Sequence, residues 1–243
     1  MTNQEKLYYE DLLYNNGIQF EPKEHVYTMN GEEFTSATTF VGSFFEEFDE
    51  DRISKIVANR DGITQEEVLQ LWQDIREYGT LVHEEIETAD DVEDMETFEA
   101  KQGRQFLDAL ELTSDVKYMF PEALLRHPKY KVSGTSDMVV IHENGDVSLI
   151  DWKTSKKITR TAYKNKTGTK QSTQNYSDHK YNKYKLQLSV YAYILEHMLE
   201  GDVNIRNLYL VHLTPKGYDY YEMDYEKDLV QSMMEEYSNE RRR

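Results

Sequence analysis

The sequence predicts a mixed α/β (α+β) fold, in which a mixed central β-sheet is flanked by helices. Two neighbouring segments rich in β-branched and apolar residues, 131–141 and 147–153, predict a β-hairpin around Glu-Asn-Gly-Asp at 143–146. Apolar residues recur at helical spacing on both sides of this hairpin. The predicted strands are 116–125, 131–141, 147–153, 207–213 and 218–224, and the predicted helices are 64–86, 98–112, 183–199 and 226–240.

The first quarter of the chain predicts a smaller element beside this core. A short helix over 8–14 precedes two strands, 19–27 and 33–39, which flank a second Asn-Gly turn signal. We therefore expect residues 1–63 to form a β-hairpin and helical cap element, packed against a core spanning 64–243 in one compact unit. An aromatic cluster in this element is more typical of core or cap packing than of a binding surface. The cluster consists of Phe44, Phe45 and Phe48.

The helix that begins after Thr64 has clear local signals. Thr64 and Glu67 have the spacing of a capping box. Apolar or small residues then recur every three to four positions, which predicts one continuous buried stripe. The stripe comprises Val68, Trp72, Ile75, Gly79, Val82 and Ile86. His83 lies beside it, and a lone histidine near an apolar face is usually structural.

The predicted central hairpin places charged side chains on one face of the sheet. Asp151 and Lys153 project from the same face, because side chains alternate along a strand. A two-residue turn would set Asp137 opposite Trp152, whereas a three-residue Glu-Asn-Gly loop with a left-handed glycine sets Asp137 opposite Asp151. We predict the three-residue loop or an equivalent bulge. Such charges are unfavourable in a sheet unless they are paired or bind a metal.

Composition excludes several classes of protein. The chain has 243 residues, of which 30% are charged and 38% hydrophobic, as expected for one large soluble domain. No apolar run approaches the roughly 20 residues of a membrane span. The first residues resemble neither a secretory signal nor an Arg-rich transit peptide, so we expect a cytoplasmic location. There are no cysteines, which excludes disulfides, thiolate metal sites and an iron–sulfur cluster.

Charge is unevenly distributed along the chain. The net charge is −18, yet residues 156–185, the basic segment, contain nine Lys or Arg and one acidic residue. A local cluster of cations can meet phosphates on an acidic protein, because charges further apart than about 10 Å are screened. Tyr163, Tyr176, Tyr181 and Tyr184 lie within the segment and could stack on unpaired bases. The alternative is a solvated, flexible loop that is basic by chance.

The charged residues of the hairpin suit phosphodiester hydrolysis. That reaction requires an activated water and stabilisation of transition-state charge. Asp137 and Asp151 offer hard oxygen ligands suited to Mg²⁺ or Mn²⁺, and the backbone carbonyl of Trp152 is a possible third. Lys153 would stabilise transition-state charge and help to position or deprotonate the attacking water. The alternative for Asp151 and Lys153 is a salt bridge on an exposed sheet face.

Three short motifs together resemble the RecB-type exonuclease branch of the PD-(D/E)XK nuclease superfamily. They are Gly-Thr-Ser-Asp at 134–137, Ile-Asp-Trp-Lys-Thr-Ser at 150–155 and Gln-Leu-Ser-Val-Tyr at 187–191. Within that branch, the sequences of the second and third motifs are most similar to those of stand-alone phage exonucleases and of the mitochondrial genome maintenance exonuclease. The resemblance implies a restriction-endonuclease-like core with N-terminal β and helical additions.

The resemblance also implies roles for single residues. His83, in Gly-x-x-x-His-Glu, becomes a metal ligand beside the two aspartates. Glu122 on the predicted strand 116–125 supports the metal site; the alternative is an exposed strand carboxylate. Gln187 orients a metal-bound carboxylate, water or substrate, and Tyr191 touches a phosphate or a base. The alternative for both is packing and hydrogen bonding within the core. The further substrate contacts expected are Lys156, Lys164, Lys166, Lys170 and Tyr184.

We therefore expect a metal-dependent DNA exonuclease that acts with Mg²⁺ or Mn²⁺ on single-stranded DNA ends. Its expected setting is replication or recombination, with recombination or replication proteins as partners, in the bacterial host cytoplasm if the chain is phage-encoded. Two alternatives stay open. One is a catalytically inactive nuclease-fold subunit that binds DNA or acts as a recombination scaffold. The other is an acidic protein-interaction module or DNA mimic.

Overall fold

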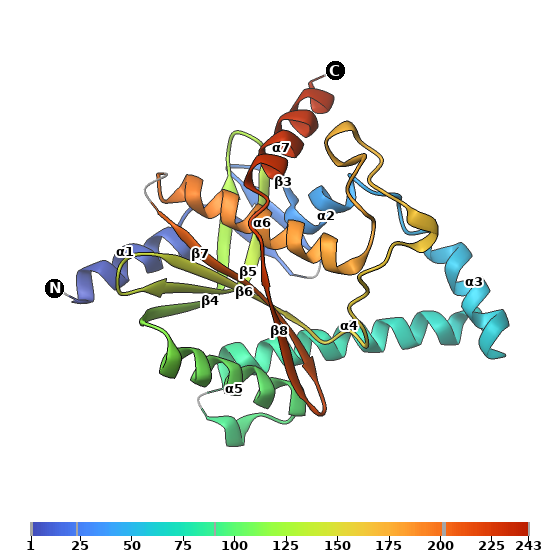
Figure 1. Ribbon diagram of the computed structural model, residues 1–243, viewed down its shortest axis with the longest axis horizontal. Helices are drawn as coiled ribbons and strands as arrows, with labels where there is room; N and C mark the ends of the chain where they lie inside the picture. The colour runs from blue at the N-terminus through green and yellow to red at the C-terminus, as the bar shows by residue number, and fades with distance from the viewer. Residues whose placement is uncertain (1, 23, 90, 201–202, 243) are drawn as a thin grey trace.

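One eight-stranded sheet organises the chain in the computed structural model, which describes residues 2–22, 24–89, 91–200 and 203–242 (Figure 1). Neighbouring strands follow the order β1-β2-β3-β5-β6-β7-β8, and β4 pairs with β5 beside this path. The β3–β5 and β6–β7 pairs are parallel and the others antiparallel, so the sheet is mixed, as predicted. The strands are β1 Gln19–Glu21, β2 Val26–Met29, β3 Glu32–Ser36, β4 Val116–His127, β5 Val132–His142, β6 Val147–Lys153, β7 Ile205–Thr214 and β8 Gly217–Met223.

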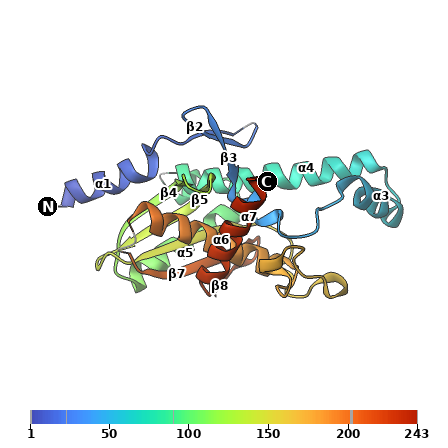
Figure 2. The same cartoon turned by 90° about the horizontal axis from the view of Figure 1, so that it is seen from above.

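Helices cover both faces of the sheet and bury a hydrophobic core on each (Figures 1 and 2). On one face α1, α2, α6 and α7 pack around a cluster that includes Phe40, Leu149 and Leu186. On the other face α4 and α5 pack around Phe106 and Trp152. The α-helices are α1 Thr2–Tyr14, α2 Ala37–Gly42, α3 Glu50–Asp61, α4 Gln65–Thr88, α5 Phe98–Thr113, α6 Lys180–Met198 and α7 Lys227–Arg241. Within the described part of the chain, no helix has both the length and the apolar character needed to cross a membrane.

The register of the β5–β6 hairpin confirms the three-residue loop. Met138 pairs with Ile150, and Gly145 adopts the left-handed conformation with φ 85°. One further step of this register sets Asp137 opposite Asp151. The loop therefore brings both aspartates to one face of the sheet, as the sequence predicts.

Strand β5 pairs with β4 along one edge and with both β3 and β6 along the other, shared edge. The β4 pairing runs from Val132 to His142. On the shared edge, β3 pairs only as far as Ser133, and β6 pairs only from Met138 onward. The Gly-Thr-Ser-Asp motif at 134–137 occupies the interval between these two partners. Tyr191 of α6 packs over this motif at Gly134.

The N-terminal region differs from the prediction in several places. The strand expected over 19–27 is instead two antiparallel strands, β1 and β2. The strand expected over 33–39 ends at Ser36, because the Ser36 hydroxyl accepts a hydrogen bond from the Thr39 amide and caps α2. Helix α3 was not predicted, although Asp49 caps its start and Gly62 is left-handed at its end. Because β3 pairs with β5, this region shares the main sheet. The domain boundary at residue 63 stays a prediction.

The buried stripe expected along α4 is wrong in the middle of the helix. Val68 and Val82 are buried, but the Ile75 side chain is 61% exposed. The 24-residue helix extends beyond the body of the protein, where its outer end packs against α3 (Figures 1 and 2). Its inner end packs against α5 and the sheet. Among the described elements none covers the middle, so Leu71 and Ile75 face solvent.

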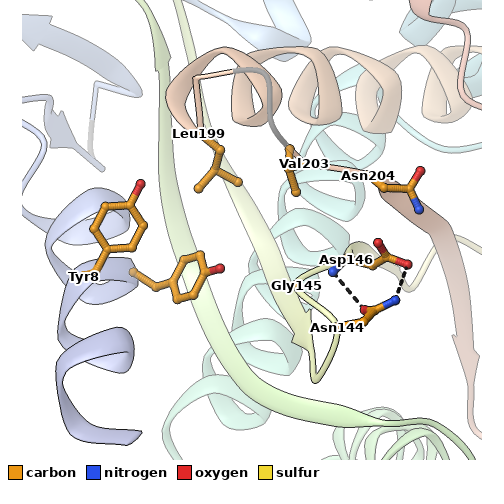
Figure 3. A pocket seen from close by; sticks show the side chains of 8 residues that line it. Tyr8, Asn144, Gly145, Asp146, Leu199, Val203 and Asn204 are labelled. Carbon is orange, nitrogen blue, oxygen red and sulfur yellow. Dashed lines mark hydrogen bonds between the residues drawn. The ribbon is translucent and has the colours of Figure 1, made fainter. Parts of the chain in front are cut away.

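A hollow of about 560 Å³ lies at the loop end of the β5–β6 hairpin (Figure 3). Tyr8 of α1, Leu199 near the end of α6, and Asn144 and Asp146 of the hairpin loop line it. Asp151 lies five residue steps after Asp146 along the strand, which corresponds to about 17 Å. The hollow is therefore remote from the paired aspartates.

Candidate active site

Three neighbouring strands each contribute one carboxylate to the same region. Asp137 of β5 lies opposite Asp151 of β6 in the hairpin register. The pairing of Ala123 with Ser136 in the β4–β5 register sets Glu122 beside Asp137. Glu122 has a positive φ of 46°, which is unusual for a glutamate in a strand. The result is a row of acidic side chains across β4, β5 and β6.

His83 joins this row from α4. Its Nδ1 lies 3.5 Å from Oδ1 of Asp137. Ligand atoms of His83, Glu122 and Asp137 all lie within 4.8 Å of one another. Two hard carboxylate oxygens and one imidazole nitrogen fit Mn²⁺, and the carboxylates alone fit Mg²⁺. This donor set fits a divalent metal; Asp151, a ligand expected from the sequence, is not among these three residues and pairs with Lys153.

Asp151 and Lys153 form a buried ion pair at the end of β6. Lys153 Nζ lies 2.6 Å from Oδ2 of Asp151, and Asp151 is 1% exposed. Gln187 of α6 donates from Nε2 to Oδ1 of Asp151 at 3.3 Å. The Lys153 ammonium also lies 5.0 Å from the centre of the Tyr184 ring. The sequence left open a salt bridge on an exposed sheet face for these two residues. The pair is buried, so that alternative is wrong.

The carboxylate of Asp137 replaces a backbone partner for β6. The Trp152 amide donates to Oδ2 of Asp137 at 2.7 Å, just past the point where the β5–β6 ladder ends. This hydrogen bond fixes one carboxylate oxygen and leaves Oδ1 directed toward His83. The Trp152 ring packs into the core on the other face, edge-on to Phe106. The role of the Trp152 carbonyl as a metal ligand stays a prediction.

Asp137, Asp151 and Lys153 are ionised at neutral pH, although each is largely buried. Burial raises the pKa of Asp151 to about 6, in spite of the adjacent Lys153 cation. Burial disfavours the Lys153 cation, but the carboxylates of Asp151 and Asp137 outweigh it and raise the pKa of Lys153. Burial would raise the pKa of Asp137, yet His83 and Lys153 hold it below its usual value. Lys153 is thus a cation in this arrangement, which favours charge stabilisation over proton abstraction.

Glu122 is the carboxyl least suited to ionise in the metal-free protein. Its burial, together with the charges of Asp137 and Glu87, raises the pKa of Glu122 to about 7. A bound cation would favour the ionised form. Upstream, the Tyr14 hydroxyl donates to the Pro121 carbonyl at 2.6 Å, and this contact holds the strand next to the unusual Glu122 backbone.

The Gln-Leu-Ser-Val-Tyr motif at 187–191 lies on α6 and faces the core. Gln187 also donates from Nε2 to the Tyr191 hydroxyl at 3.0 Å. Tyr191 is 4% exposed, so its ring does not reach the surface where a base or phosphate would bind. A Cβ added at Gly134 would lie 2.7 Å from Cε1 of Tyr191, too close for any side chain. Gly134 therefore makes room for Tyr191, which supports Gln187 against Asp151.

The basic segment has a defined path, and many of its cations are already paired. Its backbone bonds to the α2–α3 connection through Thr169, whose amide donates to the Phe44 carbonyl. Lys166 pairs with Glu46 and Lys170 with Glu240. The pairs Lys183 with Asp178 and Lys185 with Glu226 neutralise two more. Lys156 and Lys164 are exposed and have no carboxylate at ion-pair distance among the described residues.

Sequence reasoning missed two contributors to the site. Glu87 lies one helical turn after His83, and its charge raises the pKa of Glu122. The i, i+4 spacing from His83 could have identified it. Tyr27 of β2 was also missed: its hydroxyl lies 3.0 Å from Oγ1 of Thr135, inside the Gly-Thr-Ser-Asp motif. No local pattern indicates that contact, because β2 and β5 are far apart in the chain.

The mixed sheet thus brings carboxylates, a histidine and a lysine together at one end of its central strands, an arrangement suited to metal-dependent hydrolysis. The model of the PD-(D/E)XK nuclease superfamily matches residues 39–243, and the chain belongs to that superfamily. No curated protein matches the chain. A solved structure described as "Crystal structure of SSO0001" aligns with 85% of this chain and 76% of its own, at 15% identity and a TM-score of 0.40. Membership of the superfamily indicates a nuclease that uses a divalent metal and acts on DNA.

Proposed function

We propose that the protein is a metal-dependent DNA exonuclease of the RecB-type branch, acting on single-stranded ends. The observation that carries this proposal is the convergence of His83, Glu122 and Asp137 beside the buried Asp151–Lys153 pair. The superfamily supports DNA cleavage, and the motif spelling supports the RecB-type branch. We further propose action in replication or recombination, in the cytoplasm, as that branch suggests.

Each residue has a proposed task in cleavage. His83, Glu122, Asp137 and Asp151 would hold a divalent metal, which supplies charge stabilisation and lowers the pKa of an attacking water. Lys153, already a cation, would neutralise charge that develops on the scissile phosphate. Gln187 would keep Asp151 oriented through its hydrogen bond.

The substrate contacts proposed from sequence divide into two groups. Lys156, Lys164 and Tyr184 carry groups able to meet DNA, because the two lysines are exposed and Tyr184 lies beside Lys153. Lys166 and Lys170 would first have to exchange their carboxylate partners for phosphates. For Tyr191 we propose a positioning role through Gln187 in place of direct contact, because its ring is buried.

The proposal is tested with end-labelled single-stranded and double-stranded DNA in Mg²⁺, Mn²⁺ or EDTA. We expect metal-dependent shortening of single strands from an end, and a product ladder that identifies that end. A circular single strand separates the two modes of cleavage, since an exonuclease leaves it intact. DNA binding without cleavage in any metal would favour the scaffold subunit. Neither binding nor cleavage would favour the acidic interaction module.

A further inference from the structure

Helix α4 presents a second set of side chains on the face that carries His83. An α-helix turns about 100° per residue, so residues four, seven and eleven positions earlier lie within about 40° of His83 around the axis. These residues are Gly79, Arg76 and Trp72. At a rise of about 1.5 Å per residue, Arg76 lies about 10 Å and Trp72 about 16 Å from His83 along the helix. The metal-ligand face therefore continues outward as a small residue, a cation and an aromatic ring.

Phe48 extends this face beyond the helix. Its ring centre lies 5.8 Å from that of Trp72, with 54° between the ring planes. The Phe48 side chain is 62% exposed, so it does not pack in the core; it packs at the surface against Trp72. Phe44 and Phe45, from the same cluster, are buried as predicted. Together Phe48 and Trp72 form an aromatic pair with one ring open to solvent.

The segment that carries Phe48 is joined to the basic segment. Phe44 accepts a hydrogen bond from the Thr169 amide, and Glu46 pairs with Lys166. Near the active site, a Cβ added at Gly79 would lie 3.2 Å from Oγ1 of Thr154, so α4 and the chain leaving β6 approach closely there. Helix α4 thus approaches the chain that leads from Lys153 into the basic segment, and the segment that carries Phe48 contacts the basic segment further along.

Two exposed aliphatic residues of α4 belong to a different face. Leu71 and Ile75 lie about 80° to 120° away from His83 around the helix axis. They are aliphatic, and they offer no ring to a base. The Arg76 guanidinium forms a weak ion pair, in which its Nη1 lies 3.7 Å from the Glu50 carboxylate and both side chains are exposed. A phosphate could therefore replace Glu50 at little cost.

We infer that Phe48 and Trp72 form a stacking platform for unpaired bases, and that Arg76 binds a phosphate of the same strand between the platform and the metal site. This inference rests on the proposed function and specifies its substrate class. A base can stack on an aromatic side chain only when it is unstacked from its own helix. The platform therefore selects a single strand several nucleotides away from the scissile bond.

The tryptophans of the chain give a direct measurement. The chain has two, and Trp152 is 2% exposed within the core, so ligand-dependent changes in emission report on Trp72. We would titrate the full-length protein in EDTA, where no cleavage occurs, with ten-nucleotide and two-nucleotide oligothymidylates and a ten-base-pair blunt duplex. The ten-nucleotide strand is expected to quench Trp72 emission, while the dinucleotide and the duplex leave it unchanged.

Variants then separate stacking from packing. Phe48→Ala is expected to weaken binding of the ten-nucleotide strand about 5- to 50-fold, as for loss of one stacked base. Phe48→Tyr keeps a ring and should bind like the native protein. Tyr8→Ala, which removes an exposed ring on α1, serves as the matched control. Arg76→Gln should lower the salt dependence of binding.

The outcomes distinguish this inference from the proposed function. Cleavage of single strands without Trp72 quenching, or with native binding by Phe48→Ala, would overturn the platform and leave the nuclease in place. Quenching without cleavage in any metal would support the platform and overturn the nuclease. Equal quenching by the duplex would overturn the selection of single strands.

Discussion

The acidic centre and the basic segment handle charge in opposite ways. In the centre, Asp137, Asp151 and Lys153 are held in or near the core, where each ion is unfavourable without its neighbours. In the basic segment, Lys166 and Lys170 are paired with surface carboxylates at the rim of the molecule. Burial of the carboxylates therefore distinguishes the two regions: the Asp151 side chain is 2% exposed, whereas those of Glu46 and Glu240 are 53% and 48% exposed.

This comparison shows where function can be located in a chain with a net charge of −18. A surface pair contributes about 0 to 1 kcal/mol and can be exchanged for a phosphate. A buried cluster has no such freedom, because removal of one ion leaves the others uncompensated. Substitutions in the centre should consequently alter both chemistry and stability, whereas those in the basic segment should alter DNA affinity alone.

The largest effect is expected for Lys153→Ala. Cleavage should fall by about 1,000-fold or more, because this variant lacks the cation that neutralises transition-state charge. In EDTA the melting temperature should fall too, since Asp151 and Asp137 are left without their cation, and Mg²⁺ should restore part of the loss. Cleavage assays and thermal melts measured by circular dichroism provide both values. Lys157→Ala, at an exposed lysine, is the control, and a rate for Lys153→Ala within tenfold of the native rate would remove Lys153 from the mechanism.

An intermediate effect is expected for Glu122→Gln in the metal-free protein. Folding raises the pKa of Glu122 from about 4.5 to about 7, so the ionised side chain destabilises the folded state. The destabilisation is absent below about pH 4.5, grows as the pH rises to 7, and then stays constant at up to about 3 kcal/mol. Glu122→Gln should accordingly be more stable than the native protein at pH 8, and this advantage should disappear toward pH 5. Urea unfolding in EDTA across this range tests the sign, with Glu143→Gln on the exposed hairpin loop as control.

The smallest effect is expected in the basic segment, and it compares paired with unpaired cations. Lys156→Gln combined with Lys164→Gln should reduce the salt slope of single-stranded DNA binding by about 0.7 for each phosphate that the variant no longer neutralises. Lys166→Gln combined with Lys170→Gln should change the slope less, because those cations are already neutralised. Fluorescence anisotropy at several salt concentrations gives both slopes. Equal slopes for the two double variants would contradict the distinction between them.

Sequence reasoning succeeded where a local rule determines a long-range result. The Glu-Asn-Gly loop sets the register of the hairpin, so the pairing of Asp137 with Asp151 could be predicted from three residues. The capping box at Thr64 was likewise confirmed. The α4 stripe failed at Ile75, because periodicity shows which face could be buried and not whether another element reaches it.

Other features depended on long-range geometry that no local pattern encodes. Glu122 reaches His83 only through the strand order of the sheet and through an unusual backbone conformation. The buried position of Tyr191 depends on the space left by Gly134, more than fifty residues earlier in the chain. By contrast, α3 had a recognisable start and end at Asp49 and Gly62, so that helix could have been predicted.

The three-residue hairpin loop determines which side chains of strand β6 lie on each face of the sheet. Exposed loops usually tolerate the gain or loss of a residue. Here, if a loop shortened by one residue kept its three-residue form by drawing in Asp146, every side chain of β6 would turn to the opposite face and Trp152 would take the place of Asp151. A deletion about 17 Å from the acidic centre would then be equivalent to losing Asp151 and Lys153 together. Natural variation in the length of this loop should therefore be far more restricted than its exposure suggests.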